Sequence, residues 1–162
     1  MTAGSATLGL LMSVIAKLRG AGLDVWVAGG WGEEMRGMRE PGAHKDIDLV
    51  LRAPNFNALD DFVREHPEVR SVEAKRFSHK RAILWDGVLV EVVQADGVQC
   101  TITSFFNGRF VFHWPDDTFD DVSTDDSLPV ISSSGLAAYR GQHAAIERAR
   151  TAHRAALRST VA

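Results

Sequence analysis

VWVAGGWG at Val25–Gly32 and HKDIDL at His44–Leu49 are the two segments that decide the fold. The wholly apolar run Val25–Ala28 is typical of a strand that is buried on both faces. The glycines after it end that strand and predict a turn into a short helix over Trp31–Met38. Polar and apolar residues alternate over Asp46–Leu51, which predicts a second strand. The glycine turn and the aspartate pair are considered as one unit because Gly29 lies only 17 residues upstream of Asp46.

Further helices and strands are predicted around this unit. Apolar residues recur at helical spacing in two segments, and shorter apolar runs elsewhere indicate strands. Asp86-Gly87 is a strong signal for a two-residue hairpin turn, and Ser132–Ser134 can cap a long C-terminal helix that reaches toward Leu157. The predicted helices are Ser5–Arg19 and Asn55–His66; the predicted strands are Val69–Ala74, Lys80–Trp85 and Val88–Gln94, with Gln99–Thr103 and Arg109–His113 as either a further hairpin or an ordered loop.

Composition limits the class of protein. The chain has 162 residues, of which 45% are hydrophobic and 24% charged, so it can build one core and we expect a single domain over 1–162. This domain would have a core at about 22–113 and a helical segment at about 132–158. The net charge of −3 argues against a duplex nucleic acid as a partner. Apolar runs such as Val88–Val90 are far too short to cross a bilayer. The single Cys100 excludes an intramolecular disulfide and a cysteine-based metal cluster, so we expect a cytoplasmic protein without a membrane partner.

Asp46 and Asp48 are candidate metal ligands. One residue separates them within a strand, so both carboxylates point the same way while Ile47 and Leu49 point into the core. Two carboxylates this close repel each other unless a cation lies between them. Oxygen ligands of this kind suit Mg²⁺, which also binds substrate phosphates. The alternative is a pair of solvent-facing aspartates on an edge strand.

Glu91 is a third candidate because it lies within the apolar run Val88–Val93, which should be a central strand. A buried carboxylate there requires a partner or a metal ion. If Asp86-Gly87 forms a two-residue turn, Ala82 lies opposite Glu91, and Lys80 is on the same side of the sheet. The alternative is that Glu91 simply pairs with Lys80 or a neighbouring arginine.

Gly29 and Gly30 are candidates for phosphate binding. Glycines between a buried strand and a helix let backbone amides approach an anion closely, although a glycine pair is often only a tight turn. Lys45, Lys80 and Arg81 are further candidates for phosphate contacts, with ordinary solvated side chains as the alternative. The six histidines lack the spacing of a zinc site.

The GGWG of Gly29–Gly32, the H-x-D-I-D-L of His44–Leu49 and the later strand carboxylate Glu91 resemble the nucleotidyltransferase superfamily of DNA polymerase β. The two motifs are most similar to its small antibiotic-modifying branch, the aminoglycoside and lincosamide nucleotidyltransferases. This resemblance implies an α+β fold, in which a mixed β-sheet is flanked by helices and followed by a long C-terminal helix.

The resemblance also implies roles for individual residues. Asp46, Asp48 and Glu91 would be the catalytic carboxylates and would bind two Mg²⁺ ions. Glu91 would be similar in role to a general base that takes the proton of an acceptor hydroxyl. Gly29 and Gly30 would cradle the triphosphate of a nucleotide. Two-metal sites of this type stabilise both the attacking and the leaving oxygen of an in-line displacement.

The leading hypothesis is Mg²⁺-dependent transfer of a nucleoside monophosphate from an NTP, with ATP as the first choice, to a hydroxyl of a small molecule. An aminoglycoside- or lincosamide-like antibiotic is the expected acceptor, and acids at Glu33, Glu34 and Asp116–Asp126 would attract a polycation. The alternatives are transfer to a protein or tRNA, as in toxin–antitoxin nucleotidyltransferases, and a nucleotide-binding module without turnover. The short chain has little room for a separate acceptor domain, which makes a homo-oligomer a further expectation.

Overall fold

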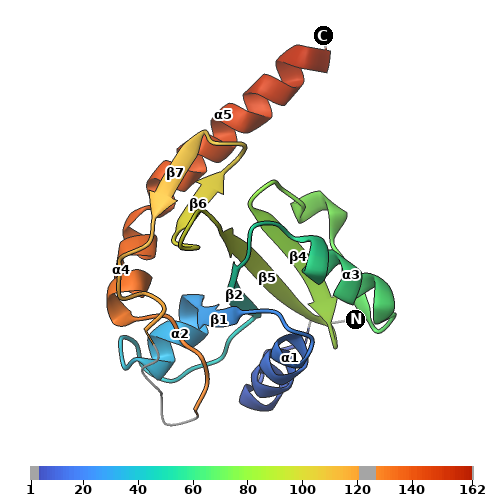
Figure 1. The fold of residues 1–162 in the computed structure, drawn as a ribbon, viewed down its shortest axis with the longest axis vertical. Coiled ribbons are helices and arrows are strands. Elements are labelled where there is room, and N and C mark those ends of the chain that lie inside the picture. Colours follow the sequence, from blue (N-terminus) through green and yellow to red (C-terminus); the bar gives the residue numbers. More distant parts are fainter. Residues whose placement is uncertain (1–3, 121–126, 162) are drawn as a thin grey trace.

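A mixed five-stranded sheet forms the centre of the computed structural model, which describes residues 4–120 and 127–161. The two parallel neighbours, β2 and β5, lie in the middle of the sheet, and the other pairs are antiparallel. A separate hairpin of two strands follows (Figure 1). The sheet runs in the order β1 (Val25–Ala28), β2 (Asp46–Arg52), β5 (Val88–Ala95), β4 (Lys80–Trp85) and β3 (Val69–Ser71), and the hairpin consists of β6 (Ile102–Phe105) and β7 (Phe110–His113).

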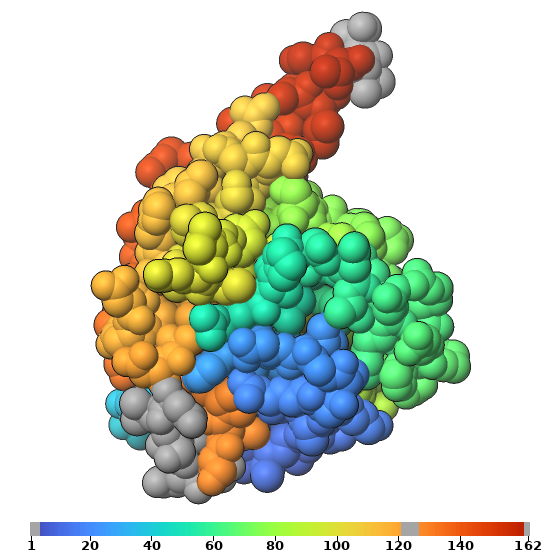
Figure 2. All heavy atoms as spheres, in the orientation of Figure 1, coloured from blue at the N-terminus to red at the C-terminus, as the bar shows by residue number. Residues whose placement is uncertain are grey.

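The structure confirms the expected α+β class, but the bounds of several elements differ from the prediction. The hairpin is present, with its first strand at Ile102–Phe105 instead of Gln99–Thr103. The short helix begins at Gly29 itself, the strand from Val69 ends at Ser71 and gives way to a 3-10 turn, and the C-terminal helix is interrupted at Gln142. The long second part of that helix projects from the body of the molecule (Figure 2). The elements are α1 (Leu8–Gly20), α2 (Gly29–Met35), α3 (Asn57–Glu65), η1 (Glu73–Lys75), α4 (Ser133–Gly141) and α5 (His143–Val161). None of the helices in the described ranges is long and apolar enough to cross a membrane.

The two faces of the sheet bury different clusters. One face packs against α1 and α3 through buried side chains such as Leu11, Leu49 and Leu59. On the other face, Val50 joins a second cluster with aromatic residues of the β6–β7 hairpin and apolar residues of α4 and α5, including Ile146. Since side chains alternate along β2, residues 46 and 48 share the face of Val50. The fold therefore aims the DxD motif at the C-terminal helices.

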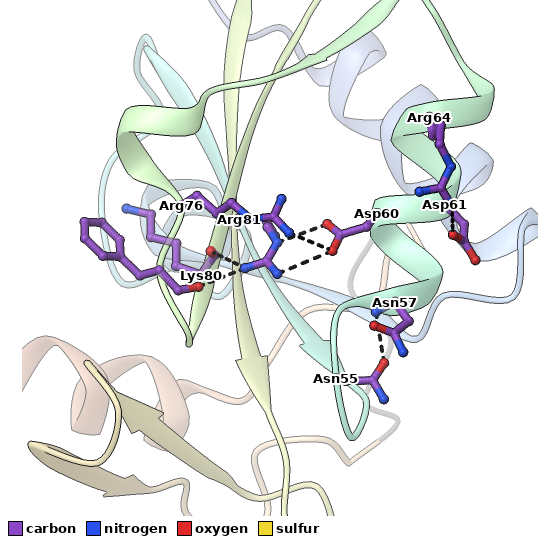
Figure 3. Close-up of polar contacts among 9 residues, drawn as sticks. Asn55, Asn57, Asp60, Asp61, Arg64, Arg76, Lys80 and Arg81 are labelled. Atoms are coloured by element: carbon purple, nitrogen blue, oxygen red, sulfur yellow. Dashed lines mark hydrogen bonds and ion pairs between the residues drawn. The ribbon is translucent and has the colours of Figure 1, made fainter.

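A shared aspartate ties α3 to the sheet (Figure 3). The Asp60 carboxylate accepts hydrogen bonds from Arg81 Nε at 3.0 Å and from Arg76 Nη2 at 3.1 Å. Arg81 Nη1 also donates to the carbonyl oxygens of Phe77 and Lys80. Arg81, a candidate for phosphate contacts from the sequence, thus holds α3 against β4.

His79 links the sheet to the β6–β7 hairpin. It is 4% exposed, and its Nδ1 accepts a hydrogen bond of 3.1 Å from the Phe106 amide. Its ring packs on Phe105 and Phe106, with centroid distances of 4.7 and 4.6 Å. Burial, reinforced by the positive charges of Lys80 and Arg150, lowers the pKa of His79 from 6.5 to about 3. The imidazole is therefore neutral in the folded protein over the physiological pH range.

We expect His79→Asn to reduce the acid sensitivity of the fold, because Asn keeps an acceptor for the Phe106 amide and has no proton to bind. A depressed folded pKa means that the unfolded chain gains the proton first, so stability from His79 is present above pH 6.5 and is lost as the pH falls toward 3. Relative to the variant, the wild type should lose about 1.4 kcal/mol of unfolding free energy per pH unit below 6.5. Urea unfolding of both proteins at several pH values measures this difference. His113→Asn, at an exposed position of β7, is the matched control.

Candidate active site

Three acids come together on the sheet face that is turned toward the C-terminal helices. Asp46 and Asp48 are half-buried on β2, and in the parallel pairing with β5 Asp48 lies opposite Glu91. The β4–β5 register is the one expected from a two-residue turn, with Ala82 opposite Glu91. All three acids line one cleft, which has a volume of about 360 Å³. The structure thus places the sequence-predicted carboxylates around a common space.

Two lysines hold the Glu91 carboxylate. Lys80 Nζ lies 3.1 Å and Lys75 Nζ 2.9 Å from Glu91 Oε1. The Lys80 side chain is 12% exposed and lines the cleft, whereas that of Lys75 is 46% exposed and comes from η1. Within residues 4–120 and 127–161, no three histidine, cysteine, aspartate or glutamate side chains are arranged to hold one metal ion. The ion pair between Glu91 and Lys80, which was the alternative to a metal-binding role for Glu91, is therefore present. Lys75 forms a second ion pair with the same carboxylate.

The charges of the three acids are strongly coupled. Burial, together with the negative charges of Asp46 and Glu91, raises the pKa of Asp48 from 3.8 to about 7. Burial also acts to raise the pKa of Glu91, but hydrogen bonds and positive charge from Lys75 and Lys80 outweigh it, and that pKa is lowered. The negative charge of Asp48 is therefore poorly compensated near neutral pH. Added positive charge in the cleft would relieve this repulsion.

Gly29 is the residue that brings the backbone against Asp48. It has a positive φ of 58°, and an added Cβ would lie only 2.2 Å from Asp48 Oδ2. Only glycine satisfies both conditions, because a side chain is strained in this backbone region and would also collide with the carboxylate. Gly29 lines the cleft beside the acids.

Gly29→Ala should therefore move the Asp48 carboxylate, and we expect activity to fall about 10-fold or more. Left-handed strain should also lower the unfolding free energy by about 1–2 kcal/mol. Gly37→Ala separates the two effects, since Gly37 has a φ of 72° but no atom lies within 4 Å of its added Cβ. That control should lose stability and keep its activity. Equal activity losses in both variants would contradict the proposed contact; thermal melts and initial rates give the comparison.

The remaining predicted phosphate contacts lie outside the cleft. Lys45 is exposed, and Gly30 is turned toward Arg39 and His44, whose Nη1 and Nδ1 atoms would lie 2.8 and 3.1 Å from an added Cβ. His44 is buried; its ring stacks on Trp31 at 4.1 Å. Gly30 therefore accommodates the packing around His44.

The extra acids of α2 are paired. Arg140 Nε donates to Glu33 Oε2 at 2.7 Å, and Arg140 Nη2 also contacts Glu33 Oε1. Glu34 Oε1 accepts a hydrogen bond from the Gly42 amide and lies 3.0 Å from His44 Nε2. Neither acid offers an unpaired negative charge to a ligand. Of the expected acidic segment Asp116–Asp126, residues 121–126 lie outside the described residues.

The opposite wall of the cleft comes from α4, α5 and Trp114, which sequence reasoning did not assign to the site. The ring of Tyr139 stacks on Trp114 at 5.2 Å, and His143 packs edge-on against Tyr139. Burial and the charges of Asp48 and Glu91 raise the pKa of Tyr139, so its hydroxyl stays protonated. The helical stripe containing Tyr139 and His143 is visible in the sequence, but its spacing is equally typical of core packing.

The mixed sheet, whose neighbouring strands β2 and β5 carry the three acids, has the fold of solved structures that include a lincosamide antibiotic adenylyltransferase. The chain belongs to the aminoglycoside-2''-adenylyltransferase family, whose model matches residues 10–153. No curated protein sequence matches the chain.

Two solved structures illustrate the fold. The lincosamide antibiotic adenylyltransferase LnuA with lincomycin bound has a TM-score of 0.67 and 13% identity, covering 91% of this chain and 98% of LnuA. The enzyme ANT(2'')-Ia in complex with adenylyl-2''-tobramycin has a TM-score of 0.57 and 17% identity, covering 95% of this chain and 98% of that one. At these sequence identities, the similarity is a similarity of fold.

Proposed function

We propose that this enzyme catalyses Mg²⁺-dependent transfer of a nucleoside monophosphate from ATP to a hydroxyl of a small aminoglycoside- or lincosamide-like antibiotic, with release of pyrophosphate. The observation that carries the proposal is the placement of Asp46, Asp48 and Glu91 from β2 and β5 around one cleft, in a chain of this family. The relatives with lincomycin or an adenylylated tobramycin support this class of acceptor.

The acids of β2 suit Mg²⁺. Asp46 and Asp48 supply hard oxygen donors from one face of the strand. Burial and the charges of Asp46 and Glu91 raise the pKa of Asp48 to about 7, which supports a need for added positive charge at this position. Asp46 and Asp48 would hold the metal, with Glu91 as the third acid of a site for two ions. When bound, Mg²⁺ neutralises charge on the phosphates and on the leaving pyrophosphate.

The protein's own groups would then organise the transfer. Gly29 leaves room for the Asp48 carboxylate beside the backbone and would cradle the triphosphate from the edge of the cleft, and Lys80 supplies positive charge within the cleft. The acceptor hydroxyl oxygen forms a bond to the α-phosphorus, while the bond from that phosphorus to the bridging oxygen of pyrophosphate breaks. Glu91 takes the hydroxyl proton, which requires a carboxylate, and the lysine contacts keep Glu91 ionised.

Acceptor recognition would use the wall formed by α4 and α5. Tyr139, whose ring stacks on buried Trp114, would give this wall an aromatic contact for a sugar or hydrocarbon ring. The polycation attraction first assigned to Glu33 and Glu34 is better assigned to the cleft acids themselves, since both α2 acids have partners. We retain a homo-oligomer and a cytoplasmic location as parts of the proposal; the single cysteine suits a reducing compartment.

Mass spectrometry of products from each of the four NTPs and a mixed antibiotic panel tests the function. We expect one antibiotic class to gain a nucleoside monophosphate, with pyrophosphate released and no reaction when Mg²⁺ is chelated. Labelling of a protein or tRNA instead would favour a macromolecular acceptor. Mg²⁺-dependent nucleotide binding without any product would favour a binding module.

A further inference from the structure

The charged groups that line the cleft are unevenly distributed. The sheet wall carries Asp46, Asp48 and Glu91, whereas α4 and α5 contribute the guanidinium groups of Arg140 and Arg150. An NTP brings several further negative charges into this space. Any protein cation that still has free hydrogen-bond donors is therefore important for binding it.

Arg140 is already engaged. Two of its nitrogens contact the two oxygens of buried Glu33, a bidentate pair that joins α4 to α2. Removing Arg140 from this pair would leave a buried carboxylate without compensation. Lys80 is likewise paired, with Glu91. Neither residue can turn to a ligand without breaking an existing ion pair.

Arg150 has spare donors. Its Nε is shielded from solvent and donates no hydrogen bond to any residue in the described ranges. Its ion-pair partner is Glu147, one helical turn away, at 3.4 Å from Nη1; that glutamate side chain is 63% exposed. A guanidinium offers five donors in a planar fork that matches phosphate oxygens. Arg150 thus has a binding capacity that the protein itself does not use.

Arg150 also lies in the right place relative to the acids. Tyr139 is close enough to Arg150, Asp48 and Glu91 for the charges of all three to act on its hydroxyl. Arg150 and Tyr139 belong to the helical wall of the cleft whose sheet wall carries the three acids. A ligand whose reacting atom lies at the acids could extend an anionic group to Arg150, whereas a polycationic acceptor would be repelled by it.

We propose that Arg150 binds the outer phosphates of the NTP and stabilises the negative charge that collects on pyrophosphate as it leaves. This inference rests on the proposed function and assigns to α5 a part of that reaction. It makes Arg150 a determinant for triphosphate over monophosphate, because only the triphosphate has a group that reaches the helical wall while the α-phosphate lies at the acids.

Calorimetric binding of the non-hydrolysable analogue α,β-methylene-ATP and of AMP, each with Mg²⁺, tests the inference on the full chain. Arg150→Gln should weaken the analogue about 10- to 100-fold, with AMP affinity changed less than about twofold. Arg150→Lys keeps the charge and loses the fork, so its loss should be smaller. Arg148→Gln, an exposed position on the same helix, is the matched control and should bind both ligands like the wild type.

The outcomes are separable. Unchanged analogue affinity in Arg150→Gln overturns the inference, and so does an equal loss for AMP, which would indicate a structural role. If Arg150→Gln fails to fold, the same comparison of affinities for the analogue and for AMP in Arg150→Lys tests the inference. If the wild type binds the analogue no better than AMP, triphosphate recognition by Arg150 is wrong even where transfer is observed. If it binds neither ligand, the proposed function fails as well.

Discussion

Asp48→Asn should abolish nucleotidyl transfer while the protein remains folded and becomes more stable. The substitution removes a proposed Mg²⁺ ligand and keeps the shape of the side chain. It also removes a buried charge and its repulsion with Asp46 and Glu91, the two effects that raise the pKa of Asp48. Transfer should fall to the background level, because the remaining acids cannot hold metal and triphosphate in the reacting geometry.

The stability gain should depend on pH in a defined direction. Because the folded pKa of Asp48 lies near 7, above its ordinary 3.8, the wild type loses stability as the pH rises from about 4 to 7 and stays at the lower level above that. The variant carries no such penalty. We therefore expect it to exceed the wild type by about 1–4 kcal/mol at pH 8 and to match it near pH 4. The unfolding free energy that Asp48 contributes thus changes with pH in the opposite direction to the contribution of His79. Each contribution is therefore measured with the variant of that residue alone.

Single-turnover transfer rates and urea unfolding at pH 4 and pH 8, with and without Mg²⁺, measure both effects. Mg²⁺ at pH 8 should stabilise the wild type and leave Asp48→Asn unchanged. Asp86→Asn, an exposed hairpin position, is the control for the same chemical change. Wild-type turnover by Asp48→Asn would exclude Asp48 as a metal ligand.

Glu91→Gln should lose about 10²- to 10⁴-fold in rate, the usual contribution of a general base. Gln keeps the side-chain length but cannot take the acceptor proton. Nucleotide binding should survive better than in Asp48→Asn, because Asp46 and Asp48 remain. The structure adds a consequence: Lys75 and Lys80 lose the carboxylate that both contact, so the cleft becomes more positive.

The test pairs single-turnover rates with calorimetric binding of Mg²⁺ and α,β-methylene-ATP. A full rate in Glu91→Gln would rule out its role as base. A loss of nucleotide binding as complete as that of Asp48→Asn would make Glu91 chiefly a metal ligand. Glu65→Gln, at the exposed end of α3, is the matched control.

The face of the acids could be predicted because it follows from local rules. Alternation along β2 places Asp46 and Asp48 together, and the two-residue turn at Asp86-Gly87 sets the phase of Glu91 on β5. Both depend on neighbours in the chain or on one turn, whereas the parallel pairing that brings Glu91 beside Asp48 is long-range, and only the family resemblance implied it. The lysine contact from β4 follows from the register set by the two-residue turn.

The contacts of the acids with η1 and with the helical wall of the cleft could not be predicted from such local rules. Lys75 reaches Glu91 from a 3-10 turn, Glu73–Lys75, that replaces the end of the strand predicted over Val69–Ala74. Tyr139 and Arg150 lie on helices whose periodicity shows which residues share a face but not what that face meets. Long-range pairings decide this, such as the bridge between Val27 and Val130 that carries the chain back beside β1 before α4 begins.

The parallel pairing of β2 with β5 also determines where the chain can tolerate a change of length. The crossover between them passes through α3, β3, η1 and β4, and its bend at Pro67 and Glu68 is exposed, so residues inserted there leave the pairing of Asp48 with Glu91 unaltered. One residue gained or lost between Gly87 and Glu91 would instead turn Glu91 to the opposite face. Natural size variation and engineered loop grafts therefore belong in the crossover, while the distance from the hairpin turn to Glu91 stays invariant.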